Sequence, residues 1–206
     1  QLKDEVIFDL LPQAFLKSRV TYALICPEQG LIHIDASSHK RAEDLLNHLR
    51  QALGTLSVRL PQTALSPDKV MTSWLNGQSM PQSWLLEDEC ELRDPMTEGG
   101  RITAKGQDLL SDEITAHIEG GYVVKRLALE WNQHLSFVLH SDLTLHRLCD
   151  EYRESIDAEA PEDAQAYLES AVWLWGKDLH QLNTELIEIM GGDNFALEQE
   201  TDGVAA

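Results

Sequence analysis

The chain has 206 residues, which is enough for one large or two small domains with a buried core. Hydrophobic residues make up 43% and charged residues 25%, which excludes a globally disordered chain, and no apolar run is long enough to span a bilayer. The formal net charge of −19 argues against a nucleic-acid partner, because proteins bind duplex DNA chiefly through Lys and Arg.

The negative charge is unevenly distributed. Residues 148–206 hold 15 acids and 2 bases, a net of −13, whereas residues 1–147 hold 20 acids and 14 bases, a net of −6. A local basic surface on residues 1–147 is therefore compatible with the composition. The three cysteines, Cys26, Cys90 and Cys149, lie far apart, so we expect small buried apolar side chains and neither a disulfide nor a zinc site. No signal-peptide pattern opens the chain, and we expect a cytoplasmic protein.

Residues 1–60 are predicted to form a first helix–hairpin–helix module. Apolar residues at helical spacing flank two short runs that resemble strands and that Pro and Gly separate. The predicted elements are a helix over 2–11, hairpin arms over 20–26 and 31–35, and a helix that contains 42–53. Ser37 or Ser38 can cap the start of the last helix, and Gly54 ends it.

Residues 61–156 are predicted to contain a connecting segment and a second module of the same kind. The predicted elements are a helix over 68–75, strands over 84–92 and 101–105, a helix from the cap Ser111 to Glu119, hairpin arms over 127–131 and 135–139, and a helix over 145–156. The hairpin alternates strictly, with Leu127, Leu129 and Trp131 on one face. That face is predicted to be core.

An acidic, Pro-containing break leads to a C-terminal amphipathic helix within 157–192, and 193–206 is predicted to be a disordered acidic tail. The helix carries one apolar stripe, formed by Leu168, Val172, Trp175, Leu179, Leu182, Leu186 and Met190. The two halves share an element order, which suggests internal duplication of a helix–hairpin–helix unit. These patterns predict an α+β fold class, with antiparallel sheets covered by helices on one face.

Two clusters of side chains could carry chemistry. Glu87, Glu89 and Glu91 share one face of a predicted strand, and convergent carboxylates can hold Mg²⁺ for phosphodiester cleavage. A solvated strand face is the more ordinary interpretation. His134, with two further histidines at 140 and 146, matches no standard zinc spacing. We therefore expect no catalytic residue, no metal and no cofactor, with a metal-dependent nuclease left as an alternative.

The few basic residues occupy similar places in the two modules. They are Lys40 and Arg41 at the start of the first module's helix, and Arg101, Lys105, Lys125, Arg126 and Arg147 around the second hairpin. Cations in a first helical turn oppose the helix dipole, a small cost that a bound phosphate could reverse. These positions are candidates for DNA binding. The alternative is scattered solubilising charge.

Several short strings, in the same order along the chain, resemble the RdgC family of recombination-associated proteins. They are Leu2–Val6, Leu10–Phe15, Gly30–Ile32, Lys40–Leu46, Asp88–Leu92, Gln107–Leu109, Asp112–Ile114 with His117, Leu127–Leu129 with Trp131, and Phe137–Leu139. The similarity runs to about Arg147 and continues more loosely to Gly191 and Gly192. Only their combination and order are specific.

The resemblance implies a nucleoid-associated homodimer, shaped as a ring that encloses double-stranded DNA without sequence preference and that restrains RecA-dependent recombination. It implies no membrane partner. An acidic chain can form such a ring, because acids can face outward while a few bases line the hole. An acidic protein-interaction module that binds no DNA is the alternative from another class.

The resemblance implies a role for three residues of this chain. Phe15 matches an apolar residue at the subunit interface, although a core phenylalanine is an alternative. Lys105 and Gln107 match a polar loop associated with DNA binding, but Gly106 stands where the family has a lysine, and His146 replaces another lysine. The region that opens the family's pattern is absent, so we expect this chain alone not to form a complete ring.

Overall fold

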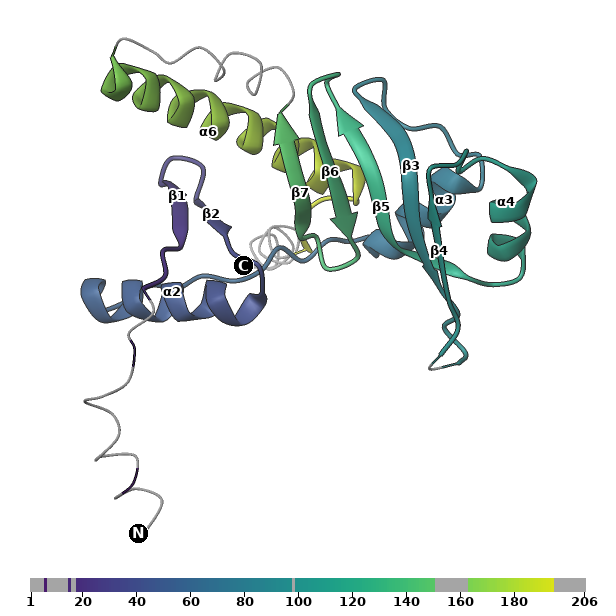
Figure 1. The fold of residues 1–206 in the computed structure, drawn as a ribbon, viewed down its shortest axis with the longest axis horizontal. Helices are drawn as coiled ribbons and strands as arrows, with labels where there is room; N and C mark the ends of the chain where they lie inside the picture. Colours follow the sequence, from purple (N-terminus) through teal and green to yellow (C-terminus); the bar gives the residue numbers. More distant parts are fainter. Residues whose placement is uncertain (1–5, 7–14, 16–17, 98, 151–162, 195–206) are drawn as a thin grey trace, which may run out of the picture. The chain divides into compact units, whose positions relative to one another are not determined.

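The computed structural model describes residues 6, 15, 18–97, 99–150 and 163–194 (Figure 1). The described residues form helices and antiparallel sheets, which confirms the predicted α+β class. The chain divides into two compact units, residues 1–58 and 59–206. No helix among the described residues is long and apolar enough to cross a membrane.

The first unit contains a hairpin and a helix, as predicted. Strands β1 (Tyr22–Cys26) and β2 (Leu31–Asp35) pair in antiparallel register, and helix α2 (His39–Leu53) follows. Ser38 caps α2 by accepting a hydrogen bond from the Arg41 backbone, and Gly54 ends the helix with a φ of 82°. The helix predicted over 2–11 lies outside the described residues, apart from Val6, which is helical.

The second unit is built on a five-stranded antiparallel sheet in the order β4-β3-β5-β6-β7. Its strands are β3 (Trp84–Arg93), β4 (Arg101–Lys105), β5 (Val123–Trp131), β6 (Leu135–His140) and β7 (Leu145–Asp150). The predicted hairpin is β5–β6, with Trp131 opposite Leu135, and its predicted core face is confirmed.

The prediction of a helix over 145–156 is wrong for the residues of that range that the structure describes. Residues Leu145–Asp150 form β7, and 151–156 lie outside the described residues. The β6–β7 register shifts between Ser136 and Val138, and Arg147 has a φ of 53°. Such an irregularity removes the strict alternation that identifies a strand. Because a strand follows the β5–β6 hairpin, the predicted duplication of a helix–hairpin–helix unit is not confirmed.

Helices cover one face of the sheet, as predicted. They are α3 (Pro67–Leu75) and the C-terminal part of α6 (Ala164–Ile189), which Figure 1 shows behind the strands, while α4 (Asp112–Glu119) lies beside α3. The core between them contains Trp84 and Phe137, whose rings meet edge to face at 6.0 Å. The predicted apolar stripe of α6 is buried in its second half, at Leu182 and Leu186, whereas Leu168 is 61% exposed.

Glu185 fixes α6 against the sheet. Its Oε2 accepts hydrogen bonds from Trp131 Nε1 at 2.8 Å, Trp84 Nε1 at 3.3 Å and Ser83 Oγ at 3.0 Å. Burial works to raise the pKa of Glu185, but hydrogen bonds from Trp131, Gln181, Ser83 and Trp84 outweigh it and lower the pKa. The ionised carboxylate is therefore part of the packing between the helix and the sheet.

Candidate nucleic-acid interface

The sheet face opposite the helices carries most of the unit's arginines. Alternation along β3 buries Cys90 and Leu92 in the core and places Glu89, Glu91 and Arg93 on the other face. The register then sets Lys105 opposite Glu89, Arg101 opposite Arg93, and Arg126 opposite Glu91. Residues far apart in the sequence thus meet on one surface.

Glu91 lies at the centre of this surface and is only 4% exposed. Its carboxylate contacts Arg93 Nε at 2.8 Å, Arg101 at 3.1 Å and Arg126 at 3.3 Å. A buried carboxylate requires compensation by charge or hydrogen bonds, and three guanidinium groups provide it here. The predicted solvated strand face is therefore wrong at Glu91.

Glu89 binds two further cations on the same surface. Its Oε2 lies 3.2 Å from Lys105 Nζ and accepts a hydrogen bond from Arg147 at 2.7 Å. Burial works to raise the pKa of Glu89, but the hydrogen bonds and charges of Arg147 and Lys105 outweigh it and lower the pKa. Arg147 thereby links β7 to β3.

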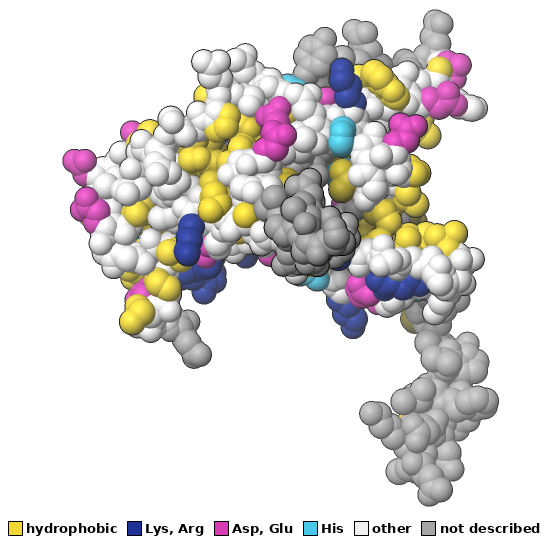
Figure 2. Space-filling view, turned by 180° about the vertical axis from the view of Figure 1, so that it is seen from behind, with side chains coloured by type: hydrophobic (Ala, Val, Ile, Leu, Met, Phe, Trp, Pro, Cys, Tyr) yellow, Lys and Arg dark blue, Asp and Glu magenta, His cyan; other side chains and the backbone are white. Residues whose placement is uncertain are grey.

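We call this surface the basic face and define it by Arg93, Arg101, Lys105, Arg126 and Arg147. Five cations against the two carboxylates of Glu89 and Glu91 leave a net charge of +3. The five basic side chains are 41–62% exposed. The exposed N–H groups of these side chains can contact further anions while the ion pairs with Glu89 and Glu91 stay in place. Seen from behind, the Lys and Arg side chains that the structure describes lie in small separate groups (Figure 2).

A pair of stacked histidines lies beside the basic face. His140 is opposite Arg126 in the β5–β6 pairing, and its ring stacks on His146 at 3.7 Å between centroids with 6° between planes. Burial, with the neighbouring His146 and Arg126, lowers the pKa of His140 to about 4. The His140 ring is therefore neutral at physiological pH. His134, the third histidine of the sequence pattern, lies instead in the β5–β6 turn.

Other predicted binding residues lie away from the basic face or make local contacts. The Nζ of Lys125 lies 2.6 Å from Asp68 on α3, which ties β5 to that helix. In the first unit Lys40 is exposed, while Arg41 donates to Ser37 Oγ at 3.1 Å and to the Val20 carbonyl at 3.2 Å. Phe15, the predicted interface residue, is fully exposed.

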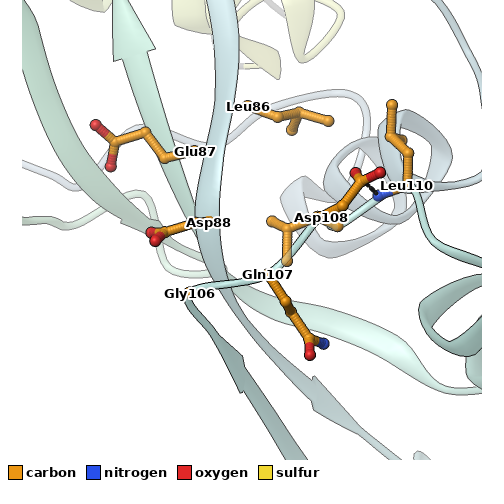
Figure 3. Close-up of a pocket in the computed structure, with 8 residues that line it drawn as sticks. Leu86, Glu87, Asp88, Gly106, Gln107, Asp108 and Leu110 are labelled. Carbon is orange, nitrogen blue, oxygen red and sulfur yellow. Dashed lines mark hydrogen bonds between the residues drawn. The ribbon is translucent and has the colours of Figure 1, made fainter.

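Gln107 lies in an acidic depression after β4 (Figure 3). Three carboxylates line it, those of Glu87, Asp88 and Asp108, and its described lining includes neither Lys nor Arg. Figure 3 shows the Gln107 side chain directed away from Glu87 and Asp88. The loop residue Gly106 has a φ of 66° and donates its N–H to the Asp88 carbonyl. None of the five cations of the basic face lines this depression.

Sequence reasoning missed Arg93 as a member of the basic face. Its position two residues after Glu91 on the same strand was the available signal, because residues i and i+2 share a face. The predicted residues Arg101, Lys105, Arg126 and Arg147 do gather there. Their common surface depends on strand register, which the spacing in the sequence does not give.

Comparison with known proteins identifies similar chains. A family described as "Putative exonuclease, RdgC" matches residues 1–193. "Recombination-associated protein RdgC" of Pseudomonas syringae pathovar tomato is 42% identical over 197 residues, which cover 95% of this chain and 64% of the relative. The protein of that name from Aeromonas hydrophila is 42% identical over 198 residues, 95% of this chain and 65% of the relative. The chain thus spans just under two thirds of these relatives.

Proposed function

Because the chain belongs to the RdgC family, we propose that it is part of a double-stranded-DNA-binding protein, with the basic face as the surface that contacts the phosphate backbone. The observation that carries the proposal is the gathering of five half-exposed cations on one sheet face of a chain whose net charge is −19. Such a concentration of positive charge is a typical electrostatic footprint of nucleic-acid binding.

Contact through phosphates explains binding without sequence preference. Phosphate contacts fix the position of a protein on the duplex but carry no base information. Glu89 and Glu91 hold the cations in place, and the exposed N–H groups of the same side chains remain able to donate charge-assisted hydrogen bonds to phosphate oxygens. We therefore expect affinity to depend on salt rather than on sequence.

For the whole protein we propose a ring-shaped homodimer around DNA that restrains RecA-dependent recombination. The name of the relatives, recombination-associated protein, supports a role in recombination. The fully exposed Phe15 supports an apolar contact with a second subunit at that position, because a large exposed apolar side chain is a candidate for burial in an interface.

We further propose that the chain acts without catalysis. A metal-dependent nuclease would need carboxylate oxygens directed at Mg²⁺. Glu89 and Glu91, two of the three acids considered for that role, each bind two or more Lys or Arg groups. A metal ion there would have to displace those cations.

Fluorescence anisotropy with labelled duplexes of two unrelated sequences, over a salt series, tests the proposal on the 206-residue chain. We expect similar affinities for both duplexes, and a log affinity that falls linearly with log salt concentration. Absence of salt-sensitive binding to DNA would contradict the proposal. Binding to a basic protein without any binding to DNA would favour the acidic protein-interaction module. Nicking of plasmid with Mg²⁺ or Mn²⁺ would overturn the non-catalytic part.

A further inference from the structure

Three potential metal ligands converge at the opposite side of the sheet from the basic face. His134 comes from the β5–β6 turn, Asp150 ends β7, and Asp178 lies on α6. One ligand atom from each lies within 4.8 Å of the others. Asp150 pairs with Leu135, a fully buried core residue, so this cluster lies on the side that the helices cover.

One hydrogen bond of His134 identifies the ring nitrogen that is available as a metal ligand. Its Nδ1 lies 3.1 Å from the carbonyl oxygen of Asn132, which can only accept, so Nδ1 carries the hydrogen. In the neutral ring Nε2 then holds a lone pair, and Nε2 lies 3.6 Å from Asp178 Oδ2. A lone pair directed at a carboxylate is repulsive unless a proton or a metal cation lies between them.

Burial of Asp150 strengthens the case for a bound cation. The residue is 3% exposed, and its carboxylate lies near that of Asp178. Two carboxylates so close together repel each other, and burial of one of them raises the cost. A divalent ion among the three side chains would attract both carboxylates and would accept the His134 lone pair.

We propose that His134, Asp150 and Asp178 form a binding site for a divalent transition-metal ion, best matched by Zn²⁺. Imidazole nitrogen and carboxylate oxygen are both ordinary zinc ligands, and three protein ligands leave a position for water. The Asn132 carbonyl supplies the outer hydrogen bond that orients a metal-bound histidine. Zinc bonds of about 2.1 Å bring ligand atoms closer than the present spacing, so binding would draw the three side chains together.

The inferred role is structural and goes beyond the proposed DNA binding. The ion would join α6 to the β5–β6 turn and to the end of β7, three segments far apart in the sequence. Because the site lies on the helix-covered side, it is not placed to act on DNA bound at the basic face. Zn²⁺ is therefore expected to stabilise the second unit and to leave DNA affinity unchanged.

Calorimetric titration of the metal-stripped, reduced 206-residue chain with Zn²⁺ tests this site. The variant Asp178→Asn keeps the shape of the side chain and removes its charge, and His146→Ala removes a histidine from the other side of the sheet as the control. We expect one ion per chain for the parent and for His146→Ala, and affinity at least ~100-fold lower for Asp178→Asn, since loss of an outer-shell partner alone can cost that much. Circular dichroism without metal checks that both variants fold.

Two further measurements test whether Zn²⁺ binds at these three residues. Zn²⁺ should raise the melting temperature of the parent chain and of His146→Ala, but not that of Asp178→Asn. In nitrogen NMR, addition of Zn²⁺ should shift the ring nitrogen signals of His134 and leave those of His146 unchanged. His134 signals that do not respond to Zn²⁺, no saturable one-to-one binding, or unchanged binding by Asp178→Asn would each overturn the proposal.

Discussion

Glu91 organises the cations of the basic face at the scale of single residues. It is nearly inaccessible, yet Arg93, Arg101 and Arg126, which surround it, are 41–51% exposed on their side chains. The carboxylate therefore fixes three guanidinium groups on a surface that solvent and ligands can reach. It also reduces the positive charge that this surface offers to DNA.

The substitution Glu91→Gln is expected to tighten DNA binding. Removal of one negative charge adds roughly 0.7–1 kcal/mol of attraction to a nearby phosphate, or about a 3- to 5-fold gain in affinity at low salt. Loss of charge-assisted hydrogen bonds should lower the free energy of unfolding by about 1–2 kcal/mol. Anisotropy and urea denaturation measure the two effects, with Glu119→Gln on α4 as a control for net charge. Weaker DNA binding by Glu91→Gln would contradict this account of the basic face.

Glu185 gives stability a dependence on pH. Its pKa is lowered in the folded protein, so its contribution is fully present above the ordinary glutamate pKa and is lost as the pH falls through the lower folded value. Glu185→Ala should also cost about 1–3 kcal/mol at neutral pH, because the buried Trp131 N–H loses its acceptor. Denaturation at pH 7 and pH 4 should find a smaller loss for the variant at pH 4. An equal loss at both pH values would exclude this role.

At the scale of elements, periodicity predicted the strands that alternate regularly and failed at an irregular one. The strands β3, β4 and β6 lie where the sequence predicted them, whereas β5 begins at Val123, before the predicted arm over 127–131. In β7, Leu145 and Leu148 are three residues apart, as on a helix, and the pairing of this strand with β6 is irregular. Tertiary pairing that overrides a local pattern is not visible in a single sequence.

The β5–β6 turn has a backbone that favours glycine at its second position. Asn132 and Gln133 have φ values of 52° and 60°, in the left-handed region that favours glycine. Gln133→Gly should therefore raise the free energy of unfolding by up to about 1 kcal/mol. Thermal denaturation measures the gain, and Gln107→Gly, in a loop with no such requirement at that position, is the comparison. A loss of stability from Gln133→Gly would contradict the turn assignment.

At the scale of the whole molecule, the distribution of charge matters more than its sum. The sequence shows that residues 148–206 carry most of the negative charge. It does not show that β3, β4, β5 and β7 bring five cations to one surface, because strand order and register decide which charged residues become neighbours. The resemblance identified the family, while the candidate surface required the fold.

The central claim is that DNA contacts the basic face rather than any positive charge on the chain. Arg126→Ala removes one cation from that face, and Lys69→Ala removes one from the exposed side of α3. The most direct measurement is the slope of log affinity against log salt concentration for random duplex DNA. We predict a slope shallower by about 0.9 for Arg126→Ala and unchanged for Lys69→Ala. Equal slopes for the parent and Arg126→Ala, or an equal change in both variants, would contradict the claim.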